Sequence, residues 1–172
     1  MKTMFNALQD YFENIVKPTV DEYLSGTGRF SIRRAKLAAI VLEHMIDYYD
    51  MEYSDSHATS SDRDRKNKIR RKIEEQCPSY SIVRSVADAT KHKSLSRTDK
   101  NIKDVKQITC PPGLFQAPFS QGYFAEAIEV CIVSDSGKMA SIEKPITELL
   151  KFWEENYKNP SFFKVDSTSI QQ

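Results

Sequence analysis

The sequence predicts a mainly helical domain that carries a small β-hairpin near its C-terminal end, an α+β class. Apolar residues recur at helical spacing through most of the first 93 residues and again after residue 145. Between these regions, alternating apolar residues flank the turn sequence Asp-Ser-Gly at 135–137. We therefore expect a helical bundle core followed by a hairpin and a last helix. At 172 residues, the chain suits one domain, predicted over 1–158, with a flexible polar tail over 159–172.

The first helix is predicted over residues 3–16. Its apolar residues are separated by steps of three and four: Phe5, Leu8, Phe12 and Ile15. Pro18 is expected to interrupt this helix, because proline lacks a backbone N–H and its ring clashes with the preceding turn. A second short helical piece follows from Thr19 to Leu24, and Gly26 and Gly28 are expected to end it.

The longest predicted helix runs from Ser31, a suitable N-cap, to about Tyr53. Its apolar residues form one wide stripe at helical spacing: Leu37, Val41, His44, Tyr48 and Met51, widened by Ala38, Leu42, Met45 and Tyr49. Charged residues are expected on the opposite, outer face: Arg33, Lys36, Glu43, Asp47 and Asp50. A stripe of this width predicts a helix buried in the core or against a partner.

Two more helices are predicted before residue 94. Residues 64–75 form a short charged helix in which Ile69 and Ile73 are the apolar contacts. Pro78 suits the first position of the next helix, over 79–93. Four of its residues are expected to face inward: Ile82, Val83, Val86 and Ala87.

From Ser94 to Tyr123 the helical period is lost, and only 104–110 suits a strand. The hairpin is predicted at about 126–143, where 126–133 alternates, the 135–137 turn follows, and 138–143 returns. Pro145 begins the last helix, whose apolar stripe contains Ile146, Leu149, Leu150, Trp153 and Tyr157.

The net charge of +1 is unevenly distributed along the chain. Residues 61–106 hold 14 Lys and Arg against 7 Asp and Glu, whereas the remainder holds 11 against 17. This asymmetry indicates an anionic partner such as RNA for the middle segment, although a solvated helix face and a charged loop give the same pattern. The candidate nucleic-acid-binding residues are Arg63, Arg65, Lys66, Arg70, Arg71, Lys91 and Lys93.

Several functional classes lack sequence support. The chain has no Gly-rich phosphate loop, no GxGxxG, no HExxH, no GxSxG and no CxxC, and we expect neither a cofactor nor a metal. Its N-terminal residues do not form a secretory signal, and no stretch is apolar enough for a membrane span. The odd number of widely spaced cysteines, three, favours reduced thiols. These features predict a cytoplasmic protein without a membrane partner.

Arg84, Asp88 and His92 are the candidate catalytic residues, because their spacing of four places them on one drifting stripe of the 79–93 helix. An imidazole can move protons to and from a ribose 2′-hydroxyl, and a guanidinium can stabilise the charged transition state of RNA cleavage. Asp88 can orient either neighbour. A purely structural alternative stays open: Asp88 pairs with Arg84 or Lys91, and His92 interacts with the helix C-terminus.

This Arg…His pattern on a late helix resembles the HEPN superfamily, whose members are often dimeric, metal-independent ribonucleases of toxin–antitoxin and antiphage systems. In this chain seven residues separate Arg84 from His92, where the superfamily has four to six. The segment DATKHKSL, residues 88–95, is also similar to uncharacterised bacterial and prophage proteins in which it precedes a hairpin and a Trp-containing helix. The first resemblance implies RNA cleavage, and the second implies no activity.

Two main functional hypotheses follow, beside a third, a DNA-binding or regulatory protein that uses residues 63–72 and 91–106. The first is an HEPN-like RNA-directed protein, a metal-independent ribonuclease of a bacterial phage-defence or toxin system, acting as a homodimer or with a protein partner. The second is a non-catalytic dimerisation or protein-interaction module, suggested by the wide apolar stripe over 37–51 and by aromatic residues at 115–124.

Overall fold

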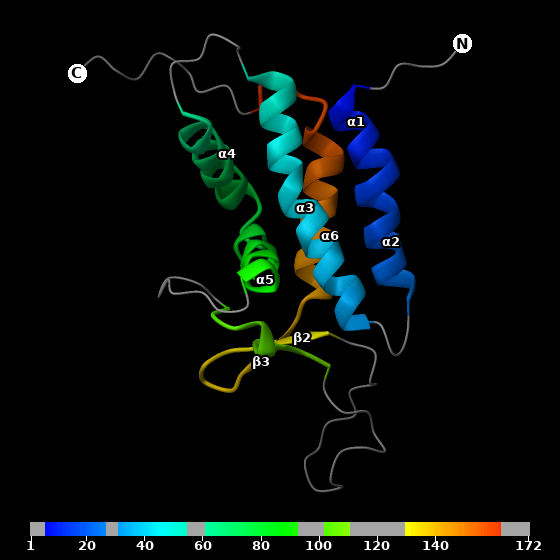
Figure 1. Ribbon diagram of the computed structural model, residues 1–172, viewed down its shortest axis with the longest axis vertical. Helices are drawn as coiled ribbons and strands as arrows, with labels where there is room; N and C mark the ends of the chain where they lie inside the picture. The colour runs from blue at the N-terminus through cyan, green and yellow to red at the C-terminus, as the bar shows by residue number, and fades with distance from the viewer. Residues whose placement is uncertain (1–5, 27–30, 55–60, 93–101, 111–129, 163–172) are drawn as a thin grey trace, which may run out of the picture.

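A computed structural model describes residues 6–26, 31–54, 61–92, 102–110 and 130–162. The predicted α+β class is confirmed: helices form a bundle, and a small antiparallel sheet lies at one end of it (Figure 1). The core is a single cluster of buried apolar residues to which all the long helices contribute. No helix in the described part of the chain combines the length and the apolar character needed to cross a membrane.

The N-terminal helical segment continues through Pro18, so the predicted interruption at that residue is wrong. α1 (Ala7–Tyr11) leads into η1, a π-helical turn (Phe12–Val16), and then into α2 (Lys17–Ser25), with Pro18 in the first turn of α2. The N–H of Lys17 donates to the carbonyl of Phe12, five residues earlier. This wider turn changes the hydrogen-bond register just before Pro18, where a regular α-helix would lose a bond and clash with the ring.

Gly26 ends α2, as predicted, and its surroundings leave no room for a side chain. A Cβ at this position would lie 2.5 Å from the carbonyl oxygen of Glu22 and 2.5 Å from Nη1 of Arg34. Arg34 is fixed in turn by a hydrogen bond from its Nε to Glu22, 3.2 Å long. The chain must therefore shift if residue 26 carries a side chain.

We expect Gly26→Ala to lower the free energy of unfolding by about 1–3 kcal/mol, the usual cost of inserting a methyl group into packed surroundings. Urea denaturation followed by circular dichroism would measure this loss. Ser25→Ala, at the exposed neighbouring position, is the matched control. Equal stability of the two variants would contradict the steric argument.

α3 (Ser31–Tyr53) has the predicted bounds and runs through the centre of the bundle beside α6 (Glu143–Asn156) (Figure 1). Only half of its predicted apolar stripe is core. The fully buried residues of α3 are Ala35, Ala38, Ala39, Leu42, Met45 and Ile46, whereas Leu37 and Met51 are exposed, Met51 by 64%. The core of this chain therefore buries about half of the predicted stripe, namely Ala38, Leu42, Met45 and Tyr49.

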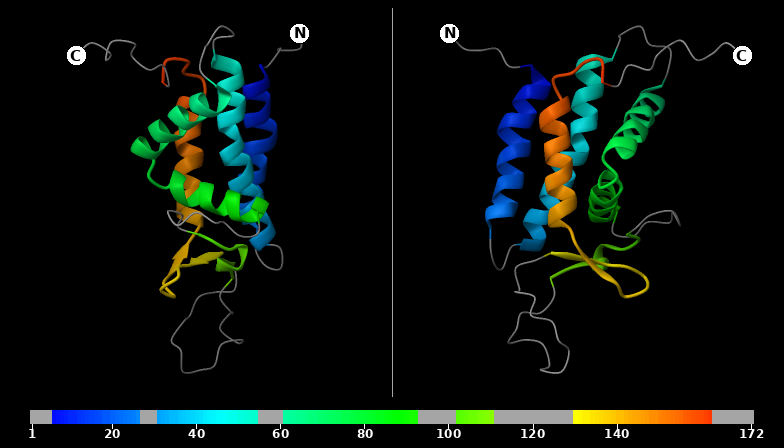
Figure 2. Two further views of the ribbon diagram at one scale, coloured as in Figure 1. Left: turned by 60° about the vertical axis from the view of Figure 1, so that its left-hand side comes forward. Right: turned by 180° about the vertical axis from the view of Figure 1, so that it is seen from behind.

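α4 (Asp62–Gln76) and α5 (Tyr80–His92) lie on the opposite side of α3 from α1 and α2 (Figures 1 and 2). The two apolar contacts predicted for α4, Ile69 and Ile73, are its buried residues. Val83, Val86 and Ala87 of α5 are buried as predicted, and Ile82 is half-buried. Pro78 lies in the turn before α5 instead of at its first helical position.

The predicted hairpin is present within 130–143, and residues 126–129 lie outside the described part. β2 (Cys131–Val133) pairs antiparallel with β3 (Met139–Ser141), and Gly137 takes a positive φ of 78° in the connecting turn. β1 (Ile108–Thr109) adds a third strand beside β2. The predicted 104–110 strand is otherwise wrong, because Asp104 caps a 3₁₀ turn, η2 (Val105–Gln107), through a capping box.

The described part of the predicted tail packs against the bundle. The hydroxyl of Tyr49 donates to the carbonyl of Asn159 at 2.6 Å, and the ring of Phe162 meets that of Phe152 edge to face, with centroids 5.4 Å apart. Residues 163–172 lie outside the described part. The domain therefore extends at least four residues beyond its predicted boundary at 158.

Candidate functional site between α3, α4 and α5

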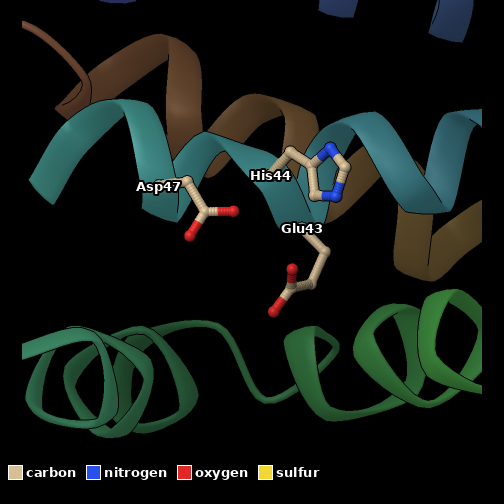
Figure 3. A group of neighbouring side chains, drawn as sticks. All are labelled: Glu43, His44 and Asp47. Carbon is tan, nitrogen blue, oxygen red and sulfur yellow. The ribbon is translucent and has the colours of Figure 1, made fainter. Parts of the chain in front are cut away.

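The candidate site contains four polar side chains of α3. Glu43, Asp47 and Asp50 follow one another at steps of four and three, and His44 lies beside Glu43. The prediction that these acids line an outer face is wrong for Glu43 and Asp50, whose side chains are only 5% and 7% exposed. Glu43 points toward α4 and α5, and His44 and Asp47 project from the same stretch of α3 (Figure 3).

An ion-pair interface joins α3 to α4, formed by three acids of α3 and three cations of α4. Arg70 donates from Nη2 to Glu43 at 3.0 Å and from Nε at 3.3 Å. Lys66 lies 2.7 Å from Asp47. The pairing is antiparallel, since residue numbers fall along α4 as they rise along α3. This α3–α4 interface therefore neutralises much of the basic segment from within the chain.

The third pair of this interface joins Arg65, near the N-terminal end of α4, to Asp50, near the C-terminal end of α3. Arg65 donates from Nε and Nη2 to the two carboxylate oxygens of Asp50, at 3.0 and 3.3 Å, and also reaches Asp62 at 2.6 Å. The hydrogen bond to Asp50 is the main cause of a raised pKa for Arg65. A bidentate guanidinium–carboxylate pair of this kind fixes geometry as well as charge, so this pair sets the register of α4 on α3.

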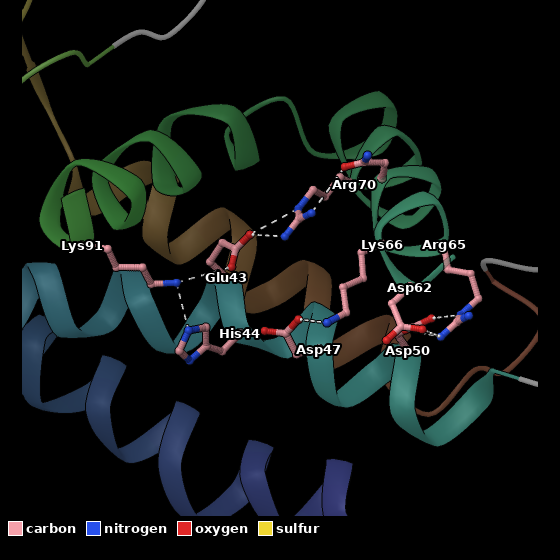
Figure 4. A network of polar contacts seen from close by, with 10 residues as sticks. Glu43, His44, Asp47, Asp50, Asp62, Arg65, Lys66, Arg70 and Lys91 are labelled. Carbon is pink, nitrogen blue, oxygen red and sulfur yellow. Dashed lines mark hydrogen bonds and ion pairs between the residues drawn. The ribbon is translucent and has the colours of Figure 1, made fainter. Parts of the chain in front are cut away.

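A polar contact between α3 and α5 joins Lys91 to His44. The ammonium nitrogen of Lys91 lies 2.9 Å from Nε2 of His44 and 4.0 Å from a carboxylate oxygen of Glu43 (Figure 4). An ammonium can only donate, so Nε2 accepts and the ring proton lies on Nδ1. The result is an unprotonated imidazole nitrogen beside a cation, on the half-exposed flank of α3.

Buried and half-buried surroundings complete the site. Burial raises the pKa of the Tyr80 phenol, and the nearby Glu43 carboxylate raises it further, so this side chain stays neutral.

Next to Asp47, a depression of about 400 Å³ lies between α3 and α4 and includes Tyr48 and Lys66 in its lining. The ring of Tyr48 is stacked on Tyr11 at 3.9 Å between centroids, which fixes its plane.

Glu43, His44 and Asp47 also satisfy the distance requirement of a metal site, since one ligand atom from each lies within 4.8 Å of the others. Their surroundings fit a metal less well. Glu43 already accepts from Arg70, Asp47 pairs with Lys66, and Lys91 occupies the side of His44 that carries Nε2. Three cationic groups of the chain thus compete for the same ligand atoms, and we assign no metal here.

The predicted catalytic residues are only partly brought together. Arg84 lies 3.9 Å from Asp88 and 3.7 Å from Glu74 of α4, so its guanidinium is shared between two carboxylates. His92 is the last residue of α5 and is exposed. It lies eight positions after Arg84, a rise of about 12 Å along the helix. The Arg84–Asp88 pair is the structural alternative left open above, and the contact with Glu74 also connects α5 to α4.

The predicted nucleic-acid-binding residues fall into four groups. Arg65, Lys66 and Arg70 belong to the α3–α4 interface, and Lys91 contacts His44. Arg63 and Arg71 are exposed on α4. Lys93 lies outside the described residues. In this conformation, therefore, few of these cations are available to an external phosphate.

Comparison of the chain with protein-family models, with curated proteins and with solved structures gave no match. The resemblance to HEPN domains therefore stays a prediction. The function has to be argued from the geometry of the site itself.

Proposed function

We propose that the protein is an RNA-directed, metal-independent ribonuclease whose reaction centre is the His44–Lys91 pair. The observation that supports this proposal is the 2.9 Å contact between Lys91 Nζ and His44 Nε2. It combines a proton acceptor with a cation, the two functions that cleavage of a ribose phosphodiester requires. The phage-defence or toxin role implied by the HEPN resemblance is part of the same proposal.

In the proposed reaction, a phosphate of the RNA attracts the Lys91 ammonium and so frees Nε2 of His44. The imidazole then removes the proton of the adjacent 2′-hydroxyl, and the 2′-oxygen attacks phosphorus. The 5′-oxygen leaves with a proton donated by His92, which follows Lys91 at the exposed end of α5. The products are a 2′,3′-cyclic phosphate and a 5′-hydroxyl, and Lys91 stabilises the negative charge that develops on the phosphorane.

Lys91 replaces Arg84 as the cation of this proposal. Arg84 is shared between two carboxylates, whereas Lys91 lies 4.0 Å from one carboxylate, that of Glu43, which already accepts from Arg70. The neighbouring depression beside Tyr48 gives a base room to approach an aromatic ring, a common mode of single-stranded RNA recognition.

The decisive experiment measures cleavage of a fluorescent single-stranded RNA in the presence of EDTA. We expect His44→Gln and Lys91→Met each to lower the rate by about 100-fold or more, the usual contribution of a positioned acid–base group. Lys144→Met is the matched control, since Lys144 is 81% exposed on α6, and it should cleave at the wild-type rate. Circular dichroism verifies that each variant is folded.

A 2′-deoxy substitution at the cleaved position should abolish cleavage, because the nucleophile is then missing. Activity in His44→Gln equal to that of the control would overturn the assignment. If Arg84→Gln lost activity and His44→Gln did not, the centre would be the originally predicted Arg84–His92 stripe.

One observation favours the non-catalytic alternative. Met51 and Leu37 are exposed on the same stripe of α3, and a stable dimer or a protein partner would cover them. Absence of cleavage by the wild type, together with a dimer in light scattering that Met51→Lys dissociates, would favour an interaction module over a ribonuclease.

A further inference from the structure

α4 is joined to the bundle largely through charge. Only Ile69 and Ile73 of its fifteen residues are buried, and three of its cations pair with acids of α3. In Figures 1 and 2 the helix lies at the edge of the bundle and diverges from α3 toward one end. A helix of this length is only marginally stable alone in water, so its order depends on this docking.

The same three cations are among the seven that the sequence predicts as nucleic-acid-binding residues. Arg65, Lys66 and Arg70 cannot contact RNA and the carboxylates of α3 with the same donor groups. A phosphate chain offers each of them an anion of equal or greater charge. RNA and the acids of α3 are therefore competitors for one face of α4.

We propose that α4 is a phosphate-binding helix kept closed by Glu43, Asp47 and Asp50, and that it undocks from α3 when single-stranded RNA binds. The proposal takes RNA as the partner from the proposed function, whereas the competition itself rests on the ion pairs. Opening also frees Glu43 from Arg70 beside the His44–Lys91 pair. Binding of RNA would thereby change the charge around the reaction centre.

Because RNA and the acids of α3 compete for the same cations, the affinity of the protein for RNA depends on how strongly α4 docks on α3. If only a fraction of the molecules has α4 undocked, the measured dissociation constant rises in inverse proportion to that fraction. A substitution that weakens the α3–α4 interface should therefore tighten RNA binding, even though it adds no contact to the RNA.

The Asp47–Lys66 pair is the best place to test this link. Its side chains are 43% and 29% exposed, so removal of the carboxylate leaves no buried unpaired charge. Asp50 and Glu43 are less suitable, because both are almost fully buried and their removal also disturbs packing. Asp47→Asn changes the charge with almost no change of shape.

The experiment measures binding of a fluorescent 2′-O-methyl RNA, which cannot be cleaved, by anisotropy. We expect Asp47→Asn to lower the dissociation constant by about two- to fivefold relative to wild type, the range for loss of a partly exposed ion pair. Glu75→Gln removes the same charge from an exposed position of α4 and should change it much less. Equal tightening in the two variants, or no RNA binding by any of them, would overturn the proposal.

A second measurement separates undocking from a local charge effect. In hydrogen exchange of the free protein, the amides of α4 should exchange faster in Asp47→Asn, while the fluorescence of Trp153, buried in the core, stays unchanged. Tighter binding without faster exchange of α4 would show that α4 does not undock. Because the RNA is uncleavable, failure of the ribonuclease proposal appears separately, as absence of cleavage of ordinary RNA.

Inorganic polyphosphate tests what α4 recognises. It carries the phosphates of RNA without sugars or bases, so it should compete for binding and show the same preference for Asp47→Asn. Failure of polyphosphate to compete would contradict recognition through the phosphate chain.

Discussion

Replacing Arg70 by alanine should lower the free energy of unfolding by about 3 kcal/mol, the lower end of the cost of breaking a buried ion pair. The loss arises from Glu43, whose side chain is 5% exposed and would lose the donors at 3.0 and 3.3 Å. Lys91, 4.0 Å away, would remain as a partial partner and keeps the loss at that lower end. Urea denaturation followed by far-UV circular dichroism would measure it.

Arg71→Ala is the matched control for this variant. Arg71 is the next residue on α4 and is exposed, so its removal should change stability by no more than about 0.5 kcal/mol. The double variant Glu43→Leu/Arg70→Ala should recover most of the loss, because an apolar side chain tolerates burial without a counter-charge. Equal stability of Arg70→Ala and Arg71→Ala would contradict the assignment of Glu43 as a buried, Arg70-dependent charge.

The helices were predictable because each one repeats its apolar residues at helical spacing. α3 runs from Ser31 to Tyr53, the predicted bounds, with Ser31 as its first helical residue, and the inward residues Ile69, Ile73, Val86 and Trp153 are all buried. Local signals also located the 135–137 turn, where Gly137 takes the positive φ that an L-residue rarely adopts. Helix bounds, inward-facing positions and tight turns are determined largely by residues close together in the chain, so one sequence is enough to predict them.

Features that depend on tertiary contacts were predicted less well. Because charged side chains are usually exposed to solvent, the sequence predicts an exposed face for Glu43 and Asp50. In the structure both side chains are buried against cations of α4. Pro18 was expected to break a helix that a π turn instead preserves. A signal for the first error exists in the sequence: acids at 43, 47 and 50 are complemented by cations at 70, 66 and 65 in reverse order. Charge complementarity between two helices therefore predicts their docking.

The candidate site illustrates the same limit. Arg84 and His92 attract attention because they share one helix, whereas His44 and Lys91 are 47 positions apart in the chain. Helical periodicity predicts contacts within one helix and not between residues of two helices. The sequence pattern also places His44 in the apolar stripe of its own helix. Their contact follows from the packing of α5 on α3, which the sequence alone does not specify.

Trp153→Ala is expected to lower the free energy of unfolding by about 3–5 kcal/mol, as for other large core aromatics. Trp153 is fully buried on α6, and its ring meets Tyr49 of α3 and Phe152 of its own helix at 6.1 and 5.6 Å between centroids. Since Tyr49 also bonds the carbonyl of Asn159, a cavity here would loosen the contact between α3, α6 and the C-terminal segment together.

The measurement for this variant is thermal or urea unfolding by circular dichroism, because Trp153 is the only tryptophan and its removal also removes the fluorescence signal. Leu150→Ala, at a half-buried position of the same helix, is the control and should lose less than half as much. A Trp153→Ala protein as stable as Leu150→Ala would mean that α3 and α6 do not depend on this ring for packing. The central position of α3, on which the geometry of His44 and Glu43 depends, would then need another explanation.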